Sequence, residues 1–289
     1  MKKALSEPLI TVYIPTYNRV SLLQRAVDSV LLQTYKNIEV IVVDDQSTDS
    51  TVEYLRSVSK CNANVRFFVN EVNSGACVSR NKAIHEARGE YVTGLDDDDY
   101  FCKDHVESLL RAWRKKDKDA IAIFPNFLRD AGGVLKKASA RLKSCRASDL
   151  IFSNWIGNQI FTQRDVLQSV GGFDEDFPAW QDYECWYRLL KNTGKKAVCS
   201  GEYTYVQDAS HAQERISSSG TDKITRAWNL FTEKHLLSRT EREIVRLMLV
   251  TYGVRNVKLR YLLIKMVRMP KPTNIKNSIV VIFKYLKII

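Results

Sequence analysis

Four consecutive aspartates, Asp96, Asp97, Asp98 and Asp99, directly follow the apolar segment Tyr91 to Leu95, which is typical of a buried strand. Adjacent carboxylates repel one another, so such a cluster needs a cation to neutralise it. Carboxylate oxygens are hard ligands that suit Mg²⁺ or Mn²⁺ carrying a diphosphate. We therefore predict a metal site at this strand end; a solvated acidic loop that caps the next helix is the alternative.

Polar residues also end two other apolar segments. The segment Glu39 to Val43 ends in Asp44 and Asp45, where a carboxylate could accept hydrogen bonds from a base, and Ile10 to Ile14 ends in Pro15-Thr16-Tyr17, where a ring could pack on a base or ribose. Each alone could merely cap a helix. Ligands of open α/β sheets bind beyond the carboxyl ends of the strands, so three polar ends together predict a nucleotide-binding crevice. Neither G-x-G-x-x-G nor G-x-x-x-x-G-K-[ST] follows these segments, which excludes dinucleotide-binding Rossmann and P-loop proteins.

Short apolar segments alternate with helical patterns over the first 125 residues, which predicts βαβ units and a mostly parallel sheet. The predicted strands are Ile10 to Ile14, Glu39 to Val43, Val65 to Val69, Tyr91 to Leu95 and Ala120 to Phe124. Two of the helices between them are predicted to begin at capping boxes, Ser21 with Gln24 and Ser50 with Glu53. A third helix is expected from Val78 to Ala87, before Gly89.

The second half of the chain has weaker patterns. Residues 126–149 contain Gly132-Gly133 and many lysines, which indicates a hairpin or loop. Short helices are predicted from Gln163 to Val170 and from Asp182 to Lys191. The polar stretch from Asp208 to Asp222 has the composition of a mobile loop or lid.

The charge of the chain is concentrated at its end. The 289 residues carry a net charge of +11, and an apolar share of 45% excludes a disordered chain. Residues 244–289 hold ten bases and no acid, so the rest is nearly neutral. From Thr225 the pattern is helical, broken by Pro270 and Pro272, and its apolar residues among bases predict an amphipathic helix on an anionic membrane surface. Packing of these helices on the preceding domain is the alternative. Nucleic-acid binding is not expected, because no recognised module or aromatic stacking platform is present.

The cellular location follows from what the sequence lacks. Six scattered cysteines without a C-x-x-C pair favour reduced thiols in the cytosol. Glu7 and Pro8 interrupt the start of the chain before any long apolar run, so no secretion signal is predicted. No apolar run reaches the roughly 18 residues that cross a bilayer. We therefore expect a cytoplasmic protein, peripheral on the inner face of the cell membrane.

The chain resembles the inverting nucleotide-sugar glycosyltransferases of family 2, with the GT-A fold. The resemblance rests on five segments in order: I-T-V-Y-I-P-T-Y-N-R, V-I-V-V-D-D-Q-S-T-D, N-S-G-A-C-V-S-R-N-K-A-I, G-E-Y-V-T-G-L-D-D-D-D and G-G-F-D-E-D-F-P-A-W-Q-D-Y-E. It covers residues 9–190. It implies a GT-A catalytic domain over residues 1–222, with a Rossmann-like, mostly parallel sheet flanked by helices. The nucleotide-sugar half would span about residues 1–125 and the acceptor half about 126–222, followed by a helical, basic C-terminal extension over 223–289.

The resemblance implies donor-binding roles at the strand ends. Pro15, Thr16 and Tyr17 match the family segment that lines the nucleotide, and Asp45 matches the acid that reads the uracil edge. Arg80 matches a basic position near the nucleotide.

The aspartate cluster matches the family's D-x-D-type motif. Asp98 is expected to ligate Mn²⁺ or Mg²⁺, Asp97 to lie on the ribose side of the donor, and Asp96 to orient both. His211 and Arg215 resemble the family's late histidine region, in which His211 would approach the metal and Arg215 the diphosphate from a closing lid. A solvated loop histidine is the alternative.

Asp182, in W-Q-D-Y-E, matches the family's catalytic base, which takes the proton of the acceptor hydroxyl as that oxygen attacks the anomeric carbon and inverts it. The family usually has Glu-Asp here, whereas Gln181 precedes Asp182 in this chain. The neutral residue leaves the base role available but removes a negative charge that would help to raise the pKa of Asp182. An N-cap of the following helix is the alternative role.

We therefore predict a metal-dependent inverting glycosyltransferase. It would move a hexose or N-acetylhexosamine from a nucleotide sugar, expected to be UDP-linked, to a hydroxyl of a glycan acceptor, expected to be a lipid-linked intermediate of O-antigen or capsule synthesis. A sugar nucleotidyltransferase is one alternative, but its usual glycine-rich basic loop is not matched by Tyr17-Asn18-Arg19-Val20. A non-catalytic, membrane-bound sugar-binding protein is the other, and intact Asp98 and Asp182 argue against it.

Overall fold

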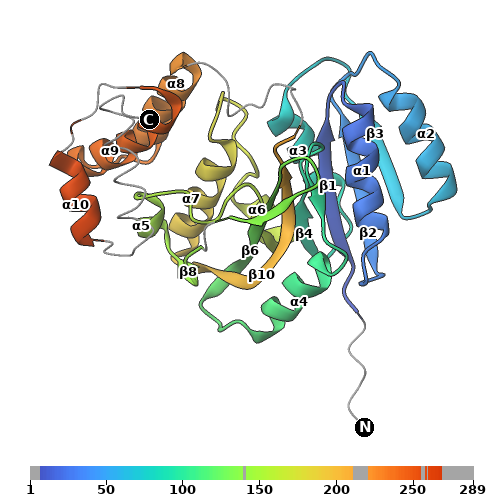
Figure 1. The fold of residues 1–289 in the computed structure, drawn as a ribbon, viewed down its shortest axis with the longest axis horizontal. Coiled ribbons are helices and arrows are strands. Elements are labelled where there is room, and N and C mark those ends of the chain that lie inside the picture. Colours follow the sequence, from blue (N-terminus) through green and yellow to red (C-terminus); the bar gives the residue numbers. More distant parts are fainter. Residues whose placement is uncertain (1–6, 139–140, 211–220, 255–257, 259, 269–289) are drawn as a thin grey trace, which may run out of the picture.

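The computed structural model describes residues 7–138, 141–210, 221–254, 258 and 260–268. These residues form a mixed ten-stranded sheet flanked by helices (Figure 1). The strands are β1 (Ile10–Thr16), β2 (Ile38–Asp44), β3 (Val65–Val69), β4 (Tyr91–Gly94), β5 (Tyr100–Phe101), β6 (Ala120–Asp130), β7 (Leu135–Lys137), β8 (Ser144–Cys145), β9 (Phe161–Gln163) and β10 (Lys196–Asp208). Their order is β3-β2-β1-β4-β9-β6-β10-β5, with β7 paired to β6 and β8 to β10.

The N-terminal part of the sheet is parallel. Ile10 of β1 pairs with Ile38 of β2 and Tyr91 of β4, and β3 continues the sheet beyond β2 in the same direction. The five predicted strands are present, with β6 running on from Phe124 to Asp130. The α/β fold class predicted from the alternation is therefore confirmed.

The second half of the sheet is mixed. β9 runs antiparallel between β4 and β6, and β10 lies parallel to β6. β6 turns into β7 through Gly132 and Gly133, which both have positive φ, so the predicted hairpin is confirmed. The sequence patterns did not predict β9 or β10.

Helices cover both faces of the sheet, and successive side chains along a strand point to opposite faces. The helices are α1 (Val20–Leu31), α2 (Thr51–Cys61), α3 (Ala76–Glu86), α4 (His105–Lys115), α5 (Ala147–Leu150), α6 (Arg164–Ser169), α7 (Gln181–Thr193), α8 (Thr221–Lys234), α9 (Arg239–Arg246), a 3₁₀ helix (Leu247–Tyr252) and α10 (Arg260–Arg268). Val12 of β1 packs with residues of α1, α2 and α4, whereas Tyr13 packs with residues of α3, α6 and α7. This period of two is what a strand buried on both faces produces.

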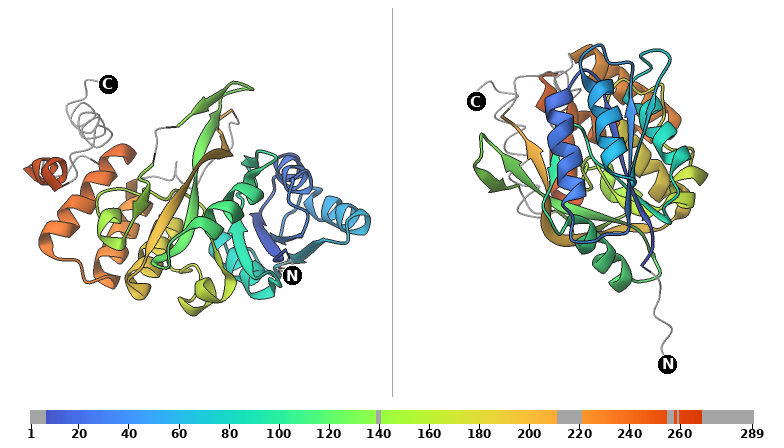
Figure 2. Two further views of the ribbon diagram at one scale, coloured as in Figure 1. Left: turned by 90° about the horizontal axis from the view of Figure 1, so that it is seen from below. Right: turned by 90° about the vertical axis from the view of Figure 1, so that its right-hand side faces the viewer.

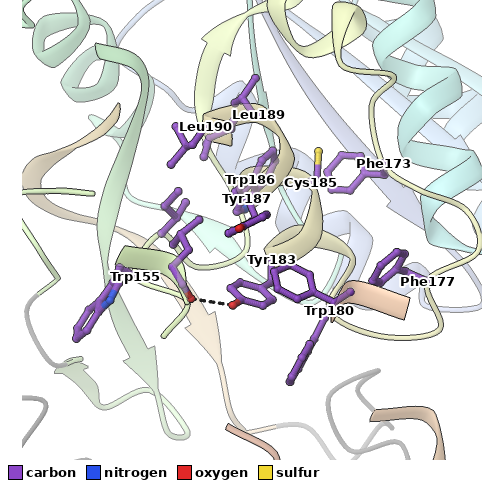
Figure 3. Packing of buried hydrophobic residues seen from close by; sticks show 14 of the residues in the cluster. Trp155, Phe173, Phe177, Trp180, Tyr183, Cys185, Trp186, Tyr187, Leu189 and Leu190 are labelled. Atoms are coloured by element: carbon purple, nitrogen blue, oxygen red, sulfur yellow. Dashed lines mark hydrogen bonds between the residues drawn. The ribbon is translucent and has the colours of Figure 1, made fainter. Parts of the chain in front are cut away.

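The C-terminal helices extend the second of these cores. Phe231 of α8 stacks on Tyr183 of α7 at a ring-centroid distance of 4.7 Å and contacts Tyr187 edge-on. Figure 3 shows the aromatic side chains of α7 in this cluster, with the Tyr183 hydroxyl donating to the Leu150 carbonyl at 2.7 Å. α8, α9 and the 3₁₀ helix lie beside α7, at the end of the molecule opposite α1 and α2 (Figure 2). The described residues of this extension up to Ile264 pack on the core of the residues before it, which agrees for this part of the chain with the predicted alternative to membrane binding.

Two observations concern the membrane and the thiols. Within the described ranges, no helix combines the length and the apolar character needed to span a bilayer. The basic end of the chain, residues 269–289, lies outside the described residues. All six cysteines are free.

The two predicted capping boxes are wrong. α1 begins after Arg19, and neither Arg19 nor Ser50 makes a side-chain cap. Asp49 serves both helices instead, because its carboxylate accepts from the backbone N–H of Val20 at 3.2 Å and of Thr51 at 3.0 Å. One acid between the two helix starts therefore replaces two local caps.

Candidate active site

A cavity of about 750 Å³ opens at the carboxyl ends of β1, β2 and β4. Of the predicted site residues, it is lined by Pro15, Thr16, Tyr17, Asp45, Arg80, Asp96, Asp97, Asp98 and Asp182. The structure thus brings together residues more than 160 positions apart in the chain. His211 and Arg215 lie outside the described residues.

The β1 end of the cavity presents an aromatic ring and a fixed carboxylate. Tyr17 is 45% exposed, although it follows a fully buried strand. Asp45 is buried and accepts hydrogen bonds from the backbone N–H of Ser74 at 2.9 Å and of Gly75 at 2.7 Å, and from the Asn70 side chain at 2.8 Å. Asp45 therefore holds the turn that starts α3 while it lines the cavity.

Two of the four adjacent aspartates share one cation. Nη1 of Arg19 lies 3.1 Å from Oδ1 of Asp97 and 3.5 Å from Oδ2 of Asp98. Oδ2 of Asp97 accepts from the Thr16 hydroxyl at 2.8 Å. Burial raises the pKa of Asp97 to about 6, even though the Arg19 charge opposes the rise, and the neighbouring Asp98 adds to it. A further positive charge at this point would therefore be stabilising.

The other two aspartates bind neighbouring segments. Asp96 accepts from Arg80 at 3.0 Å, from Asn158 at 2.8 Å and from Gln159 at 3.0 Å. Asp99 accepts from the backbone N–H of Asp208 in β10 at 3.1 Å. The Gln159 side chain packs directly against Gly94, where only glycine leaves room for it, because a Cβ at this position would lie 2.0 Å from the Gln159 side chain. Asp96 and Asp99 thus fix the strand end from which Asp97 and Asp98 project.

Arg80 links the aspartate cluster to α7. Its guanidinium donates to Asp96 and, at 3.0 Å, to Oε1 of Gln181, and it packs over the Phe173 ring at 5.2 Å. Arg80 is largely buried. In this structure it therefore connects the two acidic parts of the cavity.

Asp182 is the second residue of α7 and faces the cavity. The N-cap position belongs to Trp180, whose φ of 60° is left-handed, so the N-cap alternative for Asp182 is wrong. Oδ2 of Asp182 accepts from Nδ2 of Asn154 at 3.1 Å. Burial raises the pKa of Asp182 above the usual value for aspartate, while the Tyr183 backbone N–H and the Arg80 charge lower it. A carboxylate whose pKa is shifted toward neutral pH suits a general base.

An ion cluster anchors the helix that carries Asp182. Glu184 is fully buried and lies 2.9 Å from Arg188, 2.9 Å from Lys234 and 3.2 Å from His235. Burial alone would raise the pKa of Glu184, but its close contacts with His235, Arg188 and Lys234 hold it well below its usual range. Because Lys234 ends α8, the cluster joins α7 to the C-terminal helices.

Sequence reasoning missed several residues of the cavity. Arg19 stands in the quoted segment I-T-V-Y-I-P-T-Y-N-R, but only its distance to the aspartates reveals its contact with them. Asn154 and Asn158 lie in an irregular segment with no pattern that could have identified them. Lys223 of α8 and Tyr252 of the 3₁₀ helix also line the cavity, so the C-terminal helices contribute to its Asp182 end.

The donor set fits a metal that is shared with a ligand. Asp97 and Asp98 offer the hard carboxylate oxygens that Mg²⁺ and Mn²⁺ prefer. Among the residues that the structure describes, no group of three or more His, Cys, Asp or Glu side chains is placed to hold a metal ion by itself. The residues present thus fit a cation that completes its coordination with a diphosphate and water rather than a closed protein site.

A parallel sheet that ends in an acidic cavity, joined to a mixed second half, defines the GT-A fold of glycosyltransferases. Residues 11–171 match the family described as Glycosyl transferase family 2, and the chain belongs to this family. WcaA of Escherichia coli (strain K12), whose name refers to colanic acid biosynthesis, is 31% identical over 274 residues, which are 88% of this chain and 96% of WcaA. TuaG of Bacillus subtilis (strain 168), whose name refers to teichuronic acid biosynthesis, is 42% identical over 232 residues, which are 78% of this chain and 88% of TuaG.

Solved structures share the fold at lower identity. S. aureus TarS 1-349 in complex with UDP-GlcNAc superimposes with a TM-score of 0.68 at 17% identity, over 96% of this chain and 81% of that one. The chain spans 44% of the longer TarS structure. The mannosyltransferase PcManGT from Pyrobaculum calidifontis, in complex with GDP-Man and Mn²⁺, gives a TM-score of 0.56 at 18% identity, over 96% of this chain and 85% of that one.

Proposed function

We propose that the protein is an inverting, metal-dependent glycosyltransferase that moves a hexose or N-acetylhexosamine from a UDP-sugar to a hydroxyl of a glycan acceptor. One observation carries the proposal. Asp182, a carboxylate with a raised pKa, lines the same cavity as the Asp97–Asp98 pair and the exposed ring of Tyr17. A base and a nucleotide-diphosphate site must face one another for this reaction.

The donor would bind along the strand ends. Tyr17 packs on the base, Asp45 accepts the uracil N3–H with lone pairs that its three present hydrogen bonds leave available, and Asp97 lies at the ribose. Pro15 and Thr16 contact the nucleotide, while Asp96 and Arg80 form the part of the cavity surface between the donor and the acceptor. The UDP-GlcNAc complex of TarS, which shares the fold, supports the choice of a UDP-sugar.

The reaction is a single displacement. Asp182 accepts the proton of the acceptor hydroxyl, whose oxygen forms a bond to the anomeric carbon as the bond from that carbon to the diphosphate breaks. The electron pair leaves with the diphosphate, and the configuration at the anomeric carbon inverts. A Mn²⁺ or Mg²⁺ ion on Asp98 would stabilise the negative charge of the leaving diphosphate. Asn154 orients the carboxylate of Asp182 through its 3.1 Å hydrogen bond. His211 and Arg215 would approach the metal and the diphosphate from the segment that follows β10.

The acceptor is proposed to be a lipid-linked intermediate of a surface polysaccharide such as an O-antigen or capsule. The names of WcaA and TuaG, which refer to two such polysaccharides, support this. The protein would work in the cytoplasm, with its basic end on the anionic inner face of the membrane. The residues that would make this contact lie within 269–289.

A screen of nucleotide sugars tests the proposal. Each donor is incubated with Mn²⁺ and a set of glycan acceptors, and free UDP and the glycoside are measured, with NMR of the new anomeric proton. We expect UDP release with one sugar and the anomeric configuration opposite to that of the donor. In a parallel incubation of a sugar phosphate with a nucleoside triphosphate, release of pyrophosphate would instead show a nucleotidyltransferase. In the donor screen, retention of configuration would refute Asp182 as the base of a single displacement.

A further inference from the structure

The guanidinium of Arg19 lies where a cation serves both carboxylates of the aspartate pair. One nitrogen, Nη1, contacts Asp97 at 3.1 Å and Asp98 at 3.5 Å, so the same atom bridges two acids. The carboxylates are nearly buried, whereas the Arg19 side chain keeps 23% of its surface exposed. Arg19 is thus the most solvent-exposed of the three side chains.

The backbone around Arg19 allows the side chain to move without the helix. Arg19 is the N-cap residue of α1 and precedes its first full turn. The segment before it is held independently, because the backbone N–H of Asn18 donates to Ser47 at 2.8 Å and Oδ1 of Asn18 accepts from the Thr48 N–H at 2.7 Å. The Val20 N–H is bound by Asp49. Rotation of the Arg19 side chain therefore breaks none of these bonds.

We propose that Arg19 is an exchangeable counter-cation: it bridges Asp97 and Asp98 when no metal is bound, and moves to the diphosphate of the donor when a divalent metal takes its place. The inference rests on the proposed nucleotide-sugar function. A divalent ion on Oδ1 of Asp97 and Oδ2 of Asp98 would lie close to the guanidinium that contacts the same atoms, and the repulsion between the two cations at this short distance favours displacement of Arg19. A guanidinium matches phosphate oxygens with two parallel hydrogen bonds, so the diphosphate is a suitable second partner.

The exchange couples the two ligands. Metal alone must displace Arg19 without compensation, whereas metal with UDP gives the guanidinium a new anion. Metal and nucleotide therefore bind cooperatively, and by linkage each raises the affinity for the other by the same factor. The site then binds metal alone and nucleotide alone more weakly than it binds either of them in the presence of the other.

Mn²⁺ binding, followed by the electron paramagnetic resonance signal of free Mn²⁺, tests the exchange without any turnover. Arg19→Gln removes the charge, and Arg19→Lys keeps it as the matched control. Without nucleotide, Arg19→Gln should bind Mn²⁺ about tenfold more tightly than the wild type, whereas Arg19→Lys should stay close to it. With saturating UDP, the gain of Arg19→Gln should disappear, so that its coupling factor between Mn²⁺ and UDP is smaller. On the wild type itself, the Nε–Hε NMR signal of Arg19, assigned by its loss in Arg19→Lys, should shift when Mg²⁺ is added and shift again with UDP.

Two results would overturn the inference. If folded Arg19→Gln binds Mn²⁺ alone no more tightly than the wild type, Arg19 does not compete with the metal. If the wild type transfers sugar at full rate in EDTA and Arg19→Gln does not, Arg19 is the permanent cation of the site. Failure of every donor in the nucleotide-sugar screen would instead refute the proposed function, and would leave the Mn²⁺ titrations to be judged separately.

Discussion

Replacing Asn154 by alanine should shift the pH dependence of catalysis through Asp182. Nδ2 of Asn154 donates to Oδ2 of Asp182 at 3.1 Å, and its orientation is fixed because the Gly157 backbone N–H donates to Oδ1 at 2.9 Å. This hydrogen bond stabilises the ionised form of Asp182 and so lowers its pKa against the effect of burial. Without Asn154, this hydrogen bond no longer offsets the effect of burial, so the pKa of Asp182 rises further.

The size of the change follows from the strength of one hydrogen bond. A hydrogen bond to a charged group contributes about 1.5–3 kcal/mol. Asp182 faces the cavity, so water replaces part of the lost interaction, and we expect its pKa to rise by about one further unit, which corresponds to about 1.4 kcal/mol. A base acts in its deprotonated form. The acidic limb of the kcat profile should therefore move about one pH unit upward, and the rate should recover at high pH except for a loss from poorer orientation.

The assay is UDP release against pH, with donor and acceptor saturating so that kcat reports groups in the bound complex. Asn158→Ala is the matched control, because Asn158 lies in the same segment and contacts Asp96 and Tyr205. It should change the KM for the donor and leave the acidic limb in place. An unmoved limb in Asn154→Ala, with the protein folded, would refute the assignment of Asp182 as the titrating base. Equal shifts in both variants would point to a general change in the cavity.

Four further predictions test other parts of the molecule. Asp182→Asn should retain donor binding in calorimetry and lose about 10²-fold or more in kcat, and normal turnover would place the base elsewhere. Asp98→Ala should abolish the Mn²⁺ dependence of UDP binding, and unchanged metal-dependent affinity contradicts the metal assignment. Glu184→Gln should lower the free energy of unfolding by about 3 kcal/mol, because it leaves the buried Arg188 guanidinium without its acid. Since the folded-state pKa of Glu184 is depressed, the stability it gives is present above its ordinary value of about 4.5 and is lost as the pH falls below that, so urea melts of variant and wild type should converge in acid. Deletion of residues 275–289 should release the protein from anionic vesicles, with the intact chain released by high salt, and equal sedimentation of both forms would exclude this segment as the anchor.

The parallel half of the sheet was predictable because its signal is local. Each strand from β1 to β4 is a short apolar run, and in a parallel sheet covered on both faces such runs must be nearly continuous. Topology then brings the strand ends together without further information. This is why Tyr17, Asp45 and Asp98 could be assigned to one cavity from their positions after three strands.

The remainder depended on contacts between distant segments. β10 contains Gly201 and polar residues, and is held as a strand by pairing with β6, which no local pattern records. The helix starts of α1 and α2 looked self-capped, but Asp49 satisfies both from between them. Asn154 is placed by a loop and is recognisable only by its distance to Asp182. Local sequence patterns predict helices and strands. The residues that contact a predicted site residue, such as Asn154 beside Asp182, are brought there by tertiary packing and leave no local pattern.

Gln181 shows how a departure from the family pattern can be compensated locally. The usual glutamate would accept from Arg80, as Oε1 of Gln181 does at 3.0 Å. However, Nε2 of Gln181 also donates to the Phe177 carbonyl at 3.1 Å, and a carboxylate at this place would face that carbonyl with no proton to offer. The amide therefore satisfies both neighbours, and Asp96 is the acid that pairs with the Arg80 guanidinium at 3.0 Å. Because burial is the largest cause that raises the pKa of Asp182, and the Asp96 charge adds to it, the base role proposed for Asp182 does not require a glutamate at position 181.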